Sequence, residues 1–176
     1  MMELIFPTIE HKKAILDYRQ EWLDAEPGGR INGSWGLQNP RYEDYGLWLS
    51  EIENLRINPM PSINVPASTY FAFINDKIVG NIQVRHTLNE ELIHCSGHVG
   101  YGIRPSERRR GYATRMLALA LEKCRKLGID RVLISCDKEN IASAKTILKN
   151  GGVLENEVAE EDGSVLQRYW ITLVLF

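Results

Sequence analysis

The sequence predicts an α/β fold in which a mixed, mostly antiparallel sheet of six to seven strands is flanked by about four helices. Segments of alternating hydrophobicity joined by short turns predict antiparallel hairpins, and a strand–helix–strand run over about 97–136 predicts one central parallel pair. With 176 residues, of which 44% are hydrophobic and 25% charged, the chain has the composition of one globular domain. We therefore expect a single domain over 1–176.

The first third predicts a short strand and two helices. Apolar residues recur at three- and four-residue spacing over about 9–25 and 43–56, which is typical of amphipathic helices. The loops that follow, 26–42 and 56–67, are rich in glycine and proline but also carry apolar residues such as Trp35. We expect these loops to shape a binding site.

The central third predicts three strands in series. Residues 70–74 and 78–85 flank a turn at 75–77, with Ile78, Ile82 and Val84 expected on one face. Residues 93–103 predict the third strand. Its two interior glycines, Gly100 and Gly102, predict a β-bulge or a ligand close to the backbone.

The last third contains the clearest helix. Apolar residues from Ala113 to Leu127 follow helical spacing, and Gly128 stands where helices end. A short buried strand (132–136), a second helix (141–150) and a hairpin (153–158 and 166–173) follow. We expect 166–173 to be an apolar edge strand, which suggests a homodimer contact there.

Charge and cysteine content argue against several classes of protein. A net charge of −2 and a pI near 6.1 provide no basic excess for nucleic acid or an anionic membrane. Three cysteines without a C-x-x-C motif predict reduced core thiols, with neither a disulfide framework nor a metal site. No stretch approaches 18 apolar residues, so we expect a cytoplasmic protein.

The segment Arg104–Thr114 predicts an anion site. It joins a strand to the clearest helix, so unpaired backbone N–H groups and the positive end of the helix dipole face any ligand there. Small residues at Gly111 and Ala113 leave room for a phosphate, and the arginines add charge. The nucleotide motifs G-x-x-x-x-G-K and G-x-G-x-x-G are absent, which disfavours ATP and dinucleotides and favours another pyrophosphate ligand.

The motif Arg108-x-x-Gly111-x-Ala113, after a strand ending in Ile103-Arg104-Pro105, resembles the acetyl-coenzyme A loop of the GNAT superfamily of N-acetyltransferases. Asn140, followed by a short helix, matches a second family position. The similarity is strongest over 68–173, whereas 1–67 matches only in pattern. The resemblance implies transfer of an acetyl group from acetyl-coenzyme A to a primary amine, by direct attack in a ternary complex.

The resemblance also implies which residues bind the cofactor. The amides of 109–114 would hold the pyrophosphate, and the backbone near Tyr101 and Ile103 would bind the pantetheine arm and polarise the thioester carbonyl. Asn140 would contact the arm or brace the gap between the strands. The full set is Tyr101, Ile103, Arg108, Arg109, Arg110, Gly111, Tyr112, Ala113, Thr114 and Asn140.

Direct attack needs a base, because an alkylamine of pKa about 10 is neutral in only about one part in a thousand at pH 7. We rank His98 first and Glu91 second as this base. The tyrosine that protonates the leaving thiolate in many relatives corresponds here to Ile147, so Tyr101 or solvent would replace it.

Two other functions stay open. The missing acid favours a non-catalytic acyl-CoA-binding module of the same fold. An RNA-binding domain that uses the same arginines is disfavoured by the net charge. The acceptor, whether a small amine, an amino acid, an antibiotic or a protein terminus, is not encoded by any motif in 26–42 or 56–67.

Overall fold

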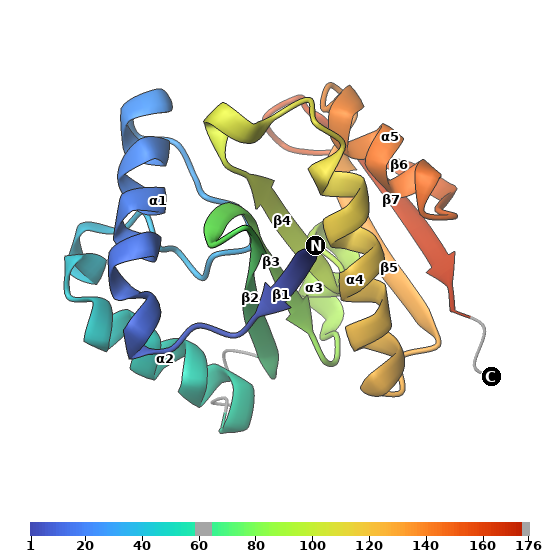
Figure 1. Cartoon of the computed structure of the whole chain (residues 1–176). Helices are drawn as coiled ribbons and strands as arrows, with labels where there is room; N and C mark the ends of the chain where they lie inside the picture. Colours follow the sequence, from blue (N-terminus) through green and yellow to red (C-terminus); the bar gives the residue numbers. More distant parts are fainter. Residues whose placement is uncertain (59–64, 174–176) are drawn as a thin grey trace.

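The computed structural model describes residues 1–58 and 65–173, which form two antiparallel sheets that meet edge to edge (Figure 1). The first sheet has the order β1-β2-β3-β4 and the second the order β5-β7-β6. The strands are β1 (Met2–Ile5), β2 (Ala67–Ile74), β3 (Lys77–Arg85), β4 (Val99–Ile103), β5 (Arg131–Asp137), β6 (Val153–Ala159) and β7 (Val165–Thr172). The predicted α/β class with a mostly antiparallel sheet is confirmed.

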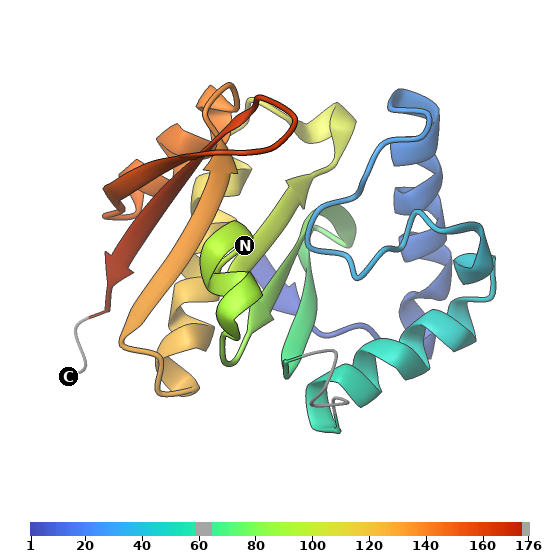
Figure 2. The ribbon, with the colours of Figure 1, turned by 180° about the vertical axis from the view of Figure 1, so that it is seen from behind.

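The helices form one layer on each side of the sheets. On one side α4 contacts β3, β1 and α5, and on the other side α1 contacts β3 while α2 contacts β2. Figure 2 shows α3 lying at the junction of the two sheets. The helices are α1 (Lys12–Ala25), α2 (Tyr45–Ile57), α3 (Glu90–Cys95), α4 (Tyr112–Lys126) and α5 (Ile141–Lys149).

Each helical layer has its own hydrophobic core. The core under α4 contains Met116, Leu117 and Ile82, whereas the core under α1 and α2 contains Tyr18, Trp48 and other buried aromatic residues. The apolar stripes that predicted the amphipathic helices are the faces that fill these two cores. The first sheet is therefore buried on both sides, and its edge strand β4 is held firmly in place.

The junction of the sheets differs from the predicted parallel pair. Among the described residues, β4 and β5 form no ladder, and the segment just before β4 reaches β5 at one isolated bridge, Gly97–Ile134. Gly97 has φ +81°, and a Cβ there would lie 2.4 Å from the Leu133 carbonyl oxygen, so only glycine permits this contact. Beyond this point the two strands separate and leave β4 with one unpaired edge.

The prediction of a strand over 93–103 is wrong in its first part, because residues 90–95 form α3. The Asn89 side chain accepts a hydrogen bond from the Leu92 amide and caps the helix, and Glu90 and Glu91 favour its positive N-terminal end. These local interactions outweigh the strand-like alternation of the segment.

A β-bulge occurs, but in β3 rather than at the β4 glycines. The register with β2 shifts where Phe73 pairs with Ile78 and Ala72 pairs with Gly80. Ile78 therefore lies in the core under α1 and α2, whereas Ile82 and Val84 lie under α4, so the shared face predicted for the three is wrong.

The glycines of β4 instead make room for the loop after α1. The β3–β4 register is continuous. A Cβ on Gly102 would lie 3.1 Å from the Trp22 ring and 3.3 Å from the Asn32 carbonyl oxygen, and a Cβ on Gly33 would lie 2.1 Å from the Gly100 carbonyl oxygen. The loop thus packs directly on the β4 backbone.

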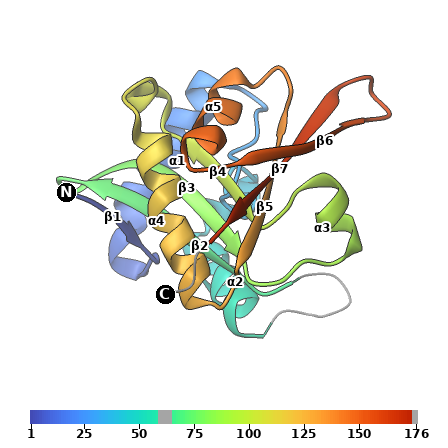
Figure 3. The same cartoon turned by 90° about the vertical axis from the view of Figure 1, so that its right-hand side faces the viewer.

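The C-terminal hairpin corrects the prediction of an apolar edge. Strand β7 lies between β5 and β6, so the edge strand of the second sheet is β6, and the hairpin extends away from the rest of the molecule (Figure 3). Residues 174–176, which belonged to the predicted dimer contact, lie outside the described residues. Across the described ranges, no helix has the length and apolar character needed to cross a bilayer.

Candidate active site

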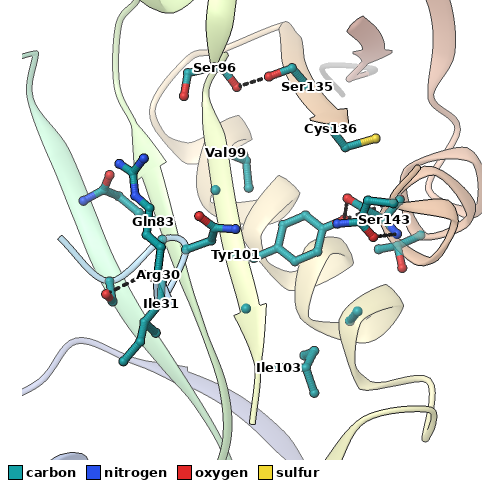
Figure 4. A pocket seen from close by; sticks show the side chains of 18 of the residues that line it. Arg30, Ile31, Gln83, Ser96, Val99, Tyr101, Ile103, Ser135, Cys136 and Ser143 are labelled. Atoms are coloured by element: carbon teal, nitrogen blue, oxygen red, sulfur yellow. Dashed lines mark hydrogen bonds between the residues drawn. The ribbon is translucent and has the colours of Figure 1, made fainter. Parts of the chain in front are cut away.

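A cleft of about 1040 Å³ opens where β4 and β5 separate. Its lining comes from both sides of the sheet. Figure 4 shows Tyr101, Cys136 and Ser143 on one side of the strand that carries Tyr101 and Ile103, and Arg30 and Gln83 on the other. The cleft therefore connects the α4–α5 side of the molecule with the α1–α2 side.

The turn before α4 forms one end of the cleft. Gly111 is the N-cap residue with φ +75°, and no side chain caps the helix. The N–H groups of the first helical turn therefore have no side-chain acceptor. A Cβ on Gly111 would meet no atom within 4 Å, so open space lies beside the helix start.

The predicted arginines differ in whether they line this space and in whether a glutamate neutralises their charge. Arg108 lines the cleft but pairs with Glu26 at 2.7 Å, and Arg110 pairs with Glu107 at 3.2 Å and does not line it. Arg109 lines the cleft, and its φ of +63° belongs to the tight turn. The other predicted cofactor residues that line the cleft are Tyr101, Ile103, Gly111, Tyr112, Ala113, Thr114 and Asn140.

The unpaired edge of β4 directs backbone polar groups into the gap. The Arg104 amide donates to the Val79 carbonyl oxygen, and the Arg85 amide donates to the His98 carbonyl oxygen. Even-numbered residues of β4 therefore bond to β3, and alternation turns the N–H and C=O groups of Tyr101 and Ile103 toward β5. In the described part of the chain no strand pairs with this edge.

Two hydroxyl groups meet inside the cleft. Tyr101 Oη and Ser143 Oγ lie 2.8 Å apart, and both residues line the cleft. Burial raises the pKa of Tyr101 to about 12, so its hydroxyl keeps its proton at neutral pH. Ile147, the position of the expected acid, is fully buried in the core under α4.

Asn140 lines the cleft at the start of α5. Its Oδ1 accepts a hydrogen bond from the Ser143 amide at 3.1 Å, which makes it the N-cap of that helix. This bond holds Ser143 at the first turn of α5, beside Tyr101. One role of Asn140 is therefore to position α5.

His98 is bonded within the sheet junction. Its Nδ1 accepts a hydrogen bond from the Leu133 amide at 3.0 Å, and its own amide donates to the Leu133 carbonyl oxygen. Burial, and secondly the charge of Arg85, lower its pKa to about 4. His98 is buried and is not among the described residues that line the cleft. The structure therefore gives it a structural position, as the link between the two sheets.

Glu91 is the predicted base that does line the cleft. It is exposed in the first turn of α3, and α3 is joined to the segment before β4 by the Gly97 amide, which donates to the Leu92 carbonyl oxygen. Cys95, on the next turn of α3, is exposed rather than buried in the core, which corrects the prediction for that thiol. All three cysteines are free.

The cleft is also lined by residues that were not identified as site residues from the sequence, among them Arg30, Gln83, Arg85 and Ser143. They come from a loop, a strand and a helix that are distant in sequence, so no motif joins them. Within residues 1–58 and 65–173, no group of three or more His, Cys, Asp or Glu side chains is arranged to hold a metal ion.

Comparison with known proteins decides the family. The model of the acetyltransferase (GNAT) domain matches residues 17–153. The chain belongs to the GNAT acetyltransferase family. A search of curated proteins found no match to this GNAT sequence.

Solved structures share the fold of this GNAT protein at low sequence identity. RimL, the ribosomal L7/L12 α-N-protein acetyltransferase in complex with coenzyme A, is 17% identical with a TM-score of 0.73, over 98% of this chain and 94% of that chain. The microcin C7 self-immunity acetyltransferase MccE, in complex with acetyl-CoA and AMP, is 15% identical with a TM-score of 0.69, over 98% and 92%. A spermidine N-acetyltransferase SpeG chimera from Vibrio cholerae and hSSAT is 16% identical with a TM-score of 0.65, over 97% and 95%.

Proposed function

We propose that this GNAT protein transfers an acetyl group from acetyl-CoA to a primary amine by direct attack of the amine on the thioester. The observation that carries the proposal is the uncapped start of α4 beside open space, continuous with the unpaired edge of β4. Acetyl-CoA has an anionic pyrophosphate for the helix start and an amide-rich arm for a free strand edge. Structural neighbours solved with coenzyme A or acetyl-CoA support the choice.

The residues of the cleft fit that cosubstrate. The amides of 112–114, with Arg109, would hold the phosphates, and the backbone of Tyr101 and Ile103 would hold the arm. When bound, acetyl-CoA supplies an activated acyl group whose C–S bond breaks as the C–N bond to the amine forms. The residues of the protein would orient the amine, accept its proton and donate a proton to the leaving thiolate.

Proton transfer is assigned to the residues that line the cleft. Glu91 would accept the proton of the amine, directly or through water, because it is the predicted base with access to the cleft. The Tyr101–Ser143 hydroxyl pair would donate a proton to the leaving thiolate, because it lies at the gap and keeps its protons at neutral pH. His98 has no part in this proposal.

Calorimetric titration with acetyl-CoA and coenzyme A tests the cosubstrate, using Gly111→Val and Gly128→Val as a matched pair. Both glycines have φ +75° and no neighbour within 4 Å of a built Cβ, and they lie at opposite ends of α4. The backbone strain of the two substitutions is therefore similar. We expect micromolar binding by the wild type and by Gly128→Val, and loss of binding in Gly111→Val.

Each result has a clear meaning. Equal binding by the two variants would move the cosubstrate away from the helix start, and absence of binding by the wild type would overturn the proposal. The second candidate function, a non-catalytic acyl-CoA-binding module, is favoured by the buried Ile147 at the position of the expected acid. Binding of acetyl-CoA without turnover of any amine would support that alternative.

A further inference from the structure

Two arginines extend into the cleft on the side opposite to Tyr101 and Ser143. Arg85 lies at the end of β3, and its Nη1 donates to the Gly97 carbonyl oxygen at 2.8 Å. Arg30 belongs to the loop after α1, and Figure 4 shows it near Gln83. Arg85 and Arg30 both line the cleft.

Their position is that of the acceptor rather than the cosubstrate. Gly97 precedes β4, whereas the turn before α4 follows it, and the five residues of β4 separate the two points by about 17 Å at ~3.3 Å per residue. Arg85 is therefore remote from the amides proposed to hold the phosphates. A group bound there lies beyond the gap at Tyr101, where the attacking amine enters.

Neither guanidinium has an acidic partner. Throughout 1–58 and 65–173, no carboxylate lies within 4.0 Å of Arg30 or Arg85, and the sequence has no Asp or Glu in 59–64 or 174–176. Neighbouring arginines differ, because Arg104, Arg108 and Arg110 each pair with a glutamate.

The two cations also act on each other. Burial lowers the pKa of Arg85, the Cys95 thiol opposes this effect, and the nearby charge of Arg30 adds to it, yet an arginine stays protonated in proteins. A half-buried cation beside a second cation is unfavourable until an anion neutralises the pair. Glu91 also lines the cleft, and in the described residues it forms no ion pair with either arginine.

We propose that the acceptor is a small amine that also carries an anionic group, a carboxylate or a phosphate, which Arg30 and Arg85 bind. This inference rests on the proposed acetyl transfer and specifies its substrate class. The planar guanidinium fork matches carboxylate and phosphate oxygens. The amine of the same molecule faces Glu91 and the gap. A polyamine, which has no anion, places its second cation against the arginines.

Matched pairs of amines test the inference. β-Alanine is compared with β-alaninamide, and phosphoethanolamine with ethanolamine, and spermidine is the cationic reference. We expect kcat/KM to favour an anionic member, and the two pairs distinguish carboxylate from phosphate. Arg30→Gln and Arg85→Gln should each lower this preference by about tenfold or more, mainly through KM. Comparing the ratio within each pair between wild type and variant cancels differences in amine reactivity.

The controls separate charge from folding. Arg131→Gln changes an exposed arginine outside the cleft and should leave the preference unchanged. Arg85→Lys keeps the charge without the fork and should retain part of the preference. Arg85→Gln could fail to fold because it loses the hydrogen bond to Gly97. In that case Arg30→Gln alone tests the inference, because Arg30 is exposed and its replacement does not disturb the core.

Calorimetry of the same amines on the protein loaded with coenzyme A makes the result independent of turnover. Tighter binding of the amine that carries an anionic group than of its partner without one, lost in Arg30→Gln, supports the inference. Equal binding of both members of each pair, or preference for spermidine, overturns it and leaves the proposed acetyl transfer standing. Failure of the wild type to bind coenzyme A overturns the proposed function instead.

Discussion

The two ends of the cleft are built from different parts of the polypeptide. At the α4 end the ligand-facing groups are backbone amides, exposed by Gly111 and by the absence of a capping side chain. At the other end they are the side chains of Arg30, Arg85 and Glu91, from three separate segments. Backbone groups suit a ligand common to a whole family, whereas side chains can change with the acceptor.

The acceptor end, which is the end of the cleft where we propose that the acceptor binds, depends on close packing between distant segments. The loop after α1 lies on the β4 backbone at Gly100, and a buried chain of hydrogen bonds from Tyr18 through Asn81 reaches the Asn32 carbonyl oxygen. The start of α4 is formed by its own turn, and its contacts with the α1 segment are polar ones at Glu21 and Glu26. We therefore expect substitutions that disturb packing to affect the acceptor end most.

The largest effect is expected for Gly33→Ala. Its Cβ would lie 2.1 Å from the Gly100 carbonyl oxygen, and φ is +72°, so overpacking and left-handed strain add. We expect the free energy of unfolding to fall by at least about 3 kcal/mol, measured by urea denaturation.

Gly28→Ala is the matched control for that change. Gly28 has φ +75° and nothing within 4 Å of a built Cβ, so only the strain of about 1 kcal/mol remains. Similar losses in the two variants would show that the loop does not rest on β4. If the Gly33 variant folds, its acetyl-CoA affinity should change less than its KM for the acceptor.

The next effect is a pH dependence of the free energy of unfolding, which we expect from His98 at the junction of the two sheets. The pKa of His98 is about 4 when folded and 6.5 when exposed, so the unfolded chain binds the proton first as pH falls. Its stabilising contribution is complete above pH 6.5 and is lost toward pH 4. The loss is at most about 3 kcal/mol.

Denaturation curves at several pH values between 7 and 4.5 measure this slope. His98→Asn keeps an acceptor for the Leu133 amide but does not titrate, so its slope should be smaller. The pKa of His86 is also lowered by burial and contributes with the same sign, so part of the slope remains. An unchanged slope in His98→Asn would exclude His98 as its source.

A smaller effect, on turnover, is expected when the hydroxyl pair of Tyr101 and Ser143 is disrupted. Tyr101→Phe removes the proposed proton donor, and kcat should fall by about ten- to hundredfold while acetyl-CoA affinity stays near the wild-type value. A thiolate of pKa about 8.5 leaves partly without help, which limits the loss. Ser143→Ala should cost a similar factor, and the double variant little more, because the two hydroxyls act as a unit. An unchanged kcat in both single variants would assign the proton to solvent.

The elements with strong local signals were predictable from the sequence. The helix predicted before Gly128 is observed as α4, and Gly128 has the positive φ that ends helices. The prediction of a strand over 93–103 was wrong in its first part. The Asn89 side chain caps a helix there, and this local hydrogen bond outweighs the strand-like alternation of apolar residues. The predicted face of Ile78 was wrong because a bulge one residue later reverses the alternation. Gly80, an interior strand glycine at the register shift, is the signal in the sequence that could have indicated this bulge.

The same contrast applies to the site. The residues around Gly111 are contiguous, so their spacing could be interpreted from the sequence alone. Arg30 and Arg85 are far apart in the sequence and line the same cleft only because the loop after α1 packs on β4. The base ranked first, His98, bonds to Leu133 of β5, a partner that only the tertiary fold brings near. Long-range contacts are the part that a single sequence does not encode in any motif.

The smallest effect is expected for the ion pair that joins the turn before α4 to the end of α1. Arg108 and Glu26 pair at 2.7 Å with both side chains substantially exposed, so Glu26→Gln should cost less than about 1 kcal/mol of stability. Glu21 is the informative comparison, because it accepts from Arg104 at 2.6 Å and from the Ser106 amide at 2.9 Å and is less exposed. Glu21→Gln should therefore lower the free energy of unfolding by more, as measured by urea denaturation.

Glu26→Gln should also free the charge of Arg108 to face the cleft. Acetyl-CoA binding should then become slightly tighter at low salt, and high salt should remove this effect. A larger stability loss in Glu26→Gln than in Glu21→Gln would contradict the greater stabilisation expected from the contacts of Glu21.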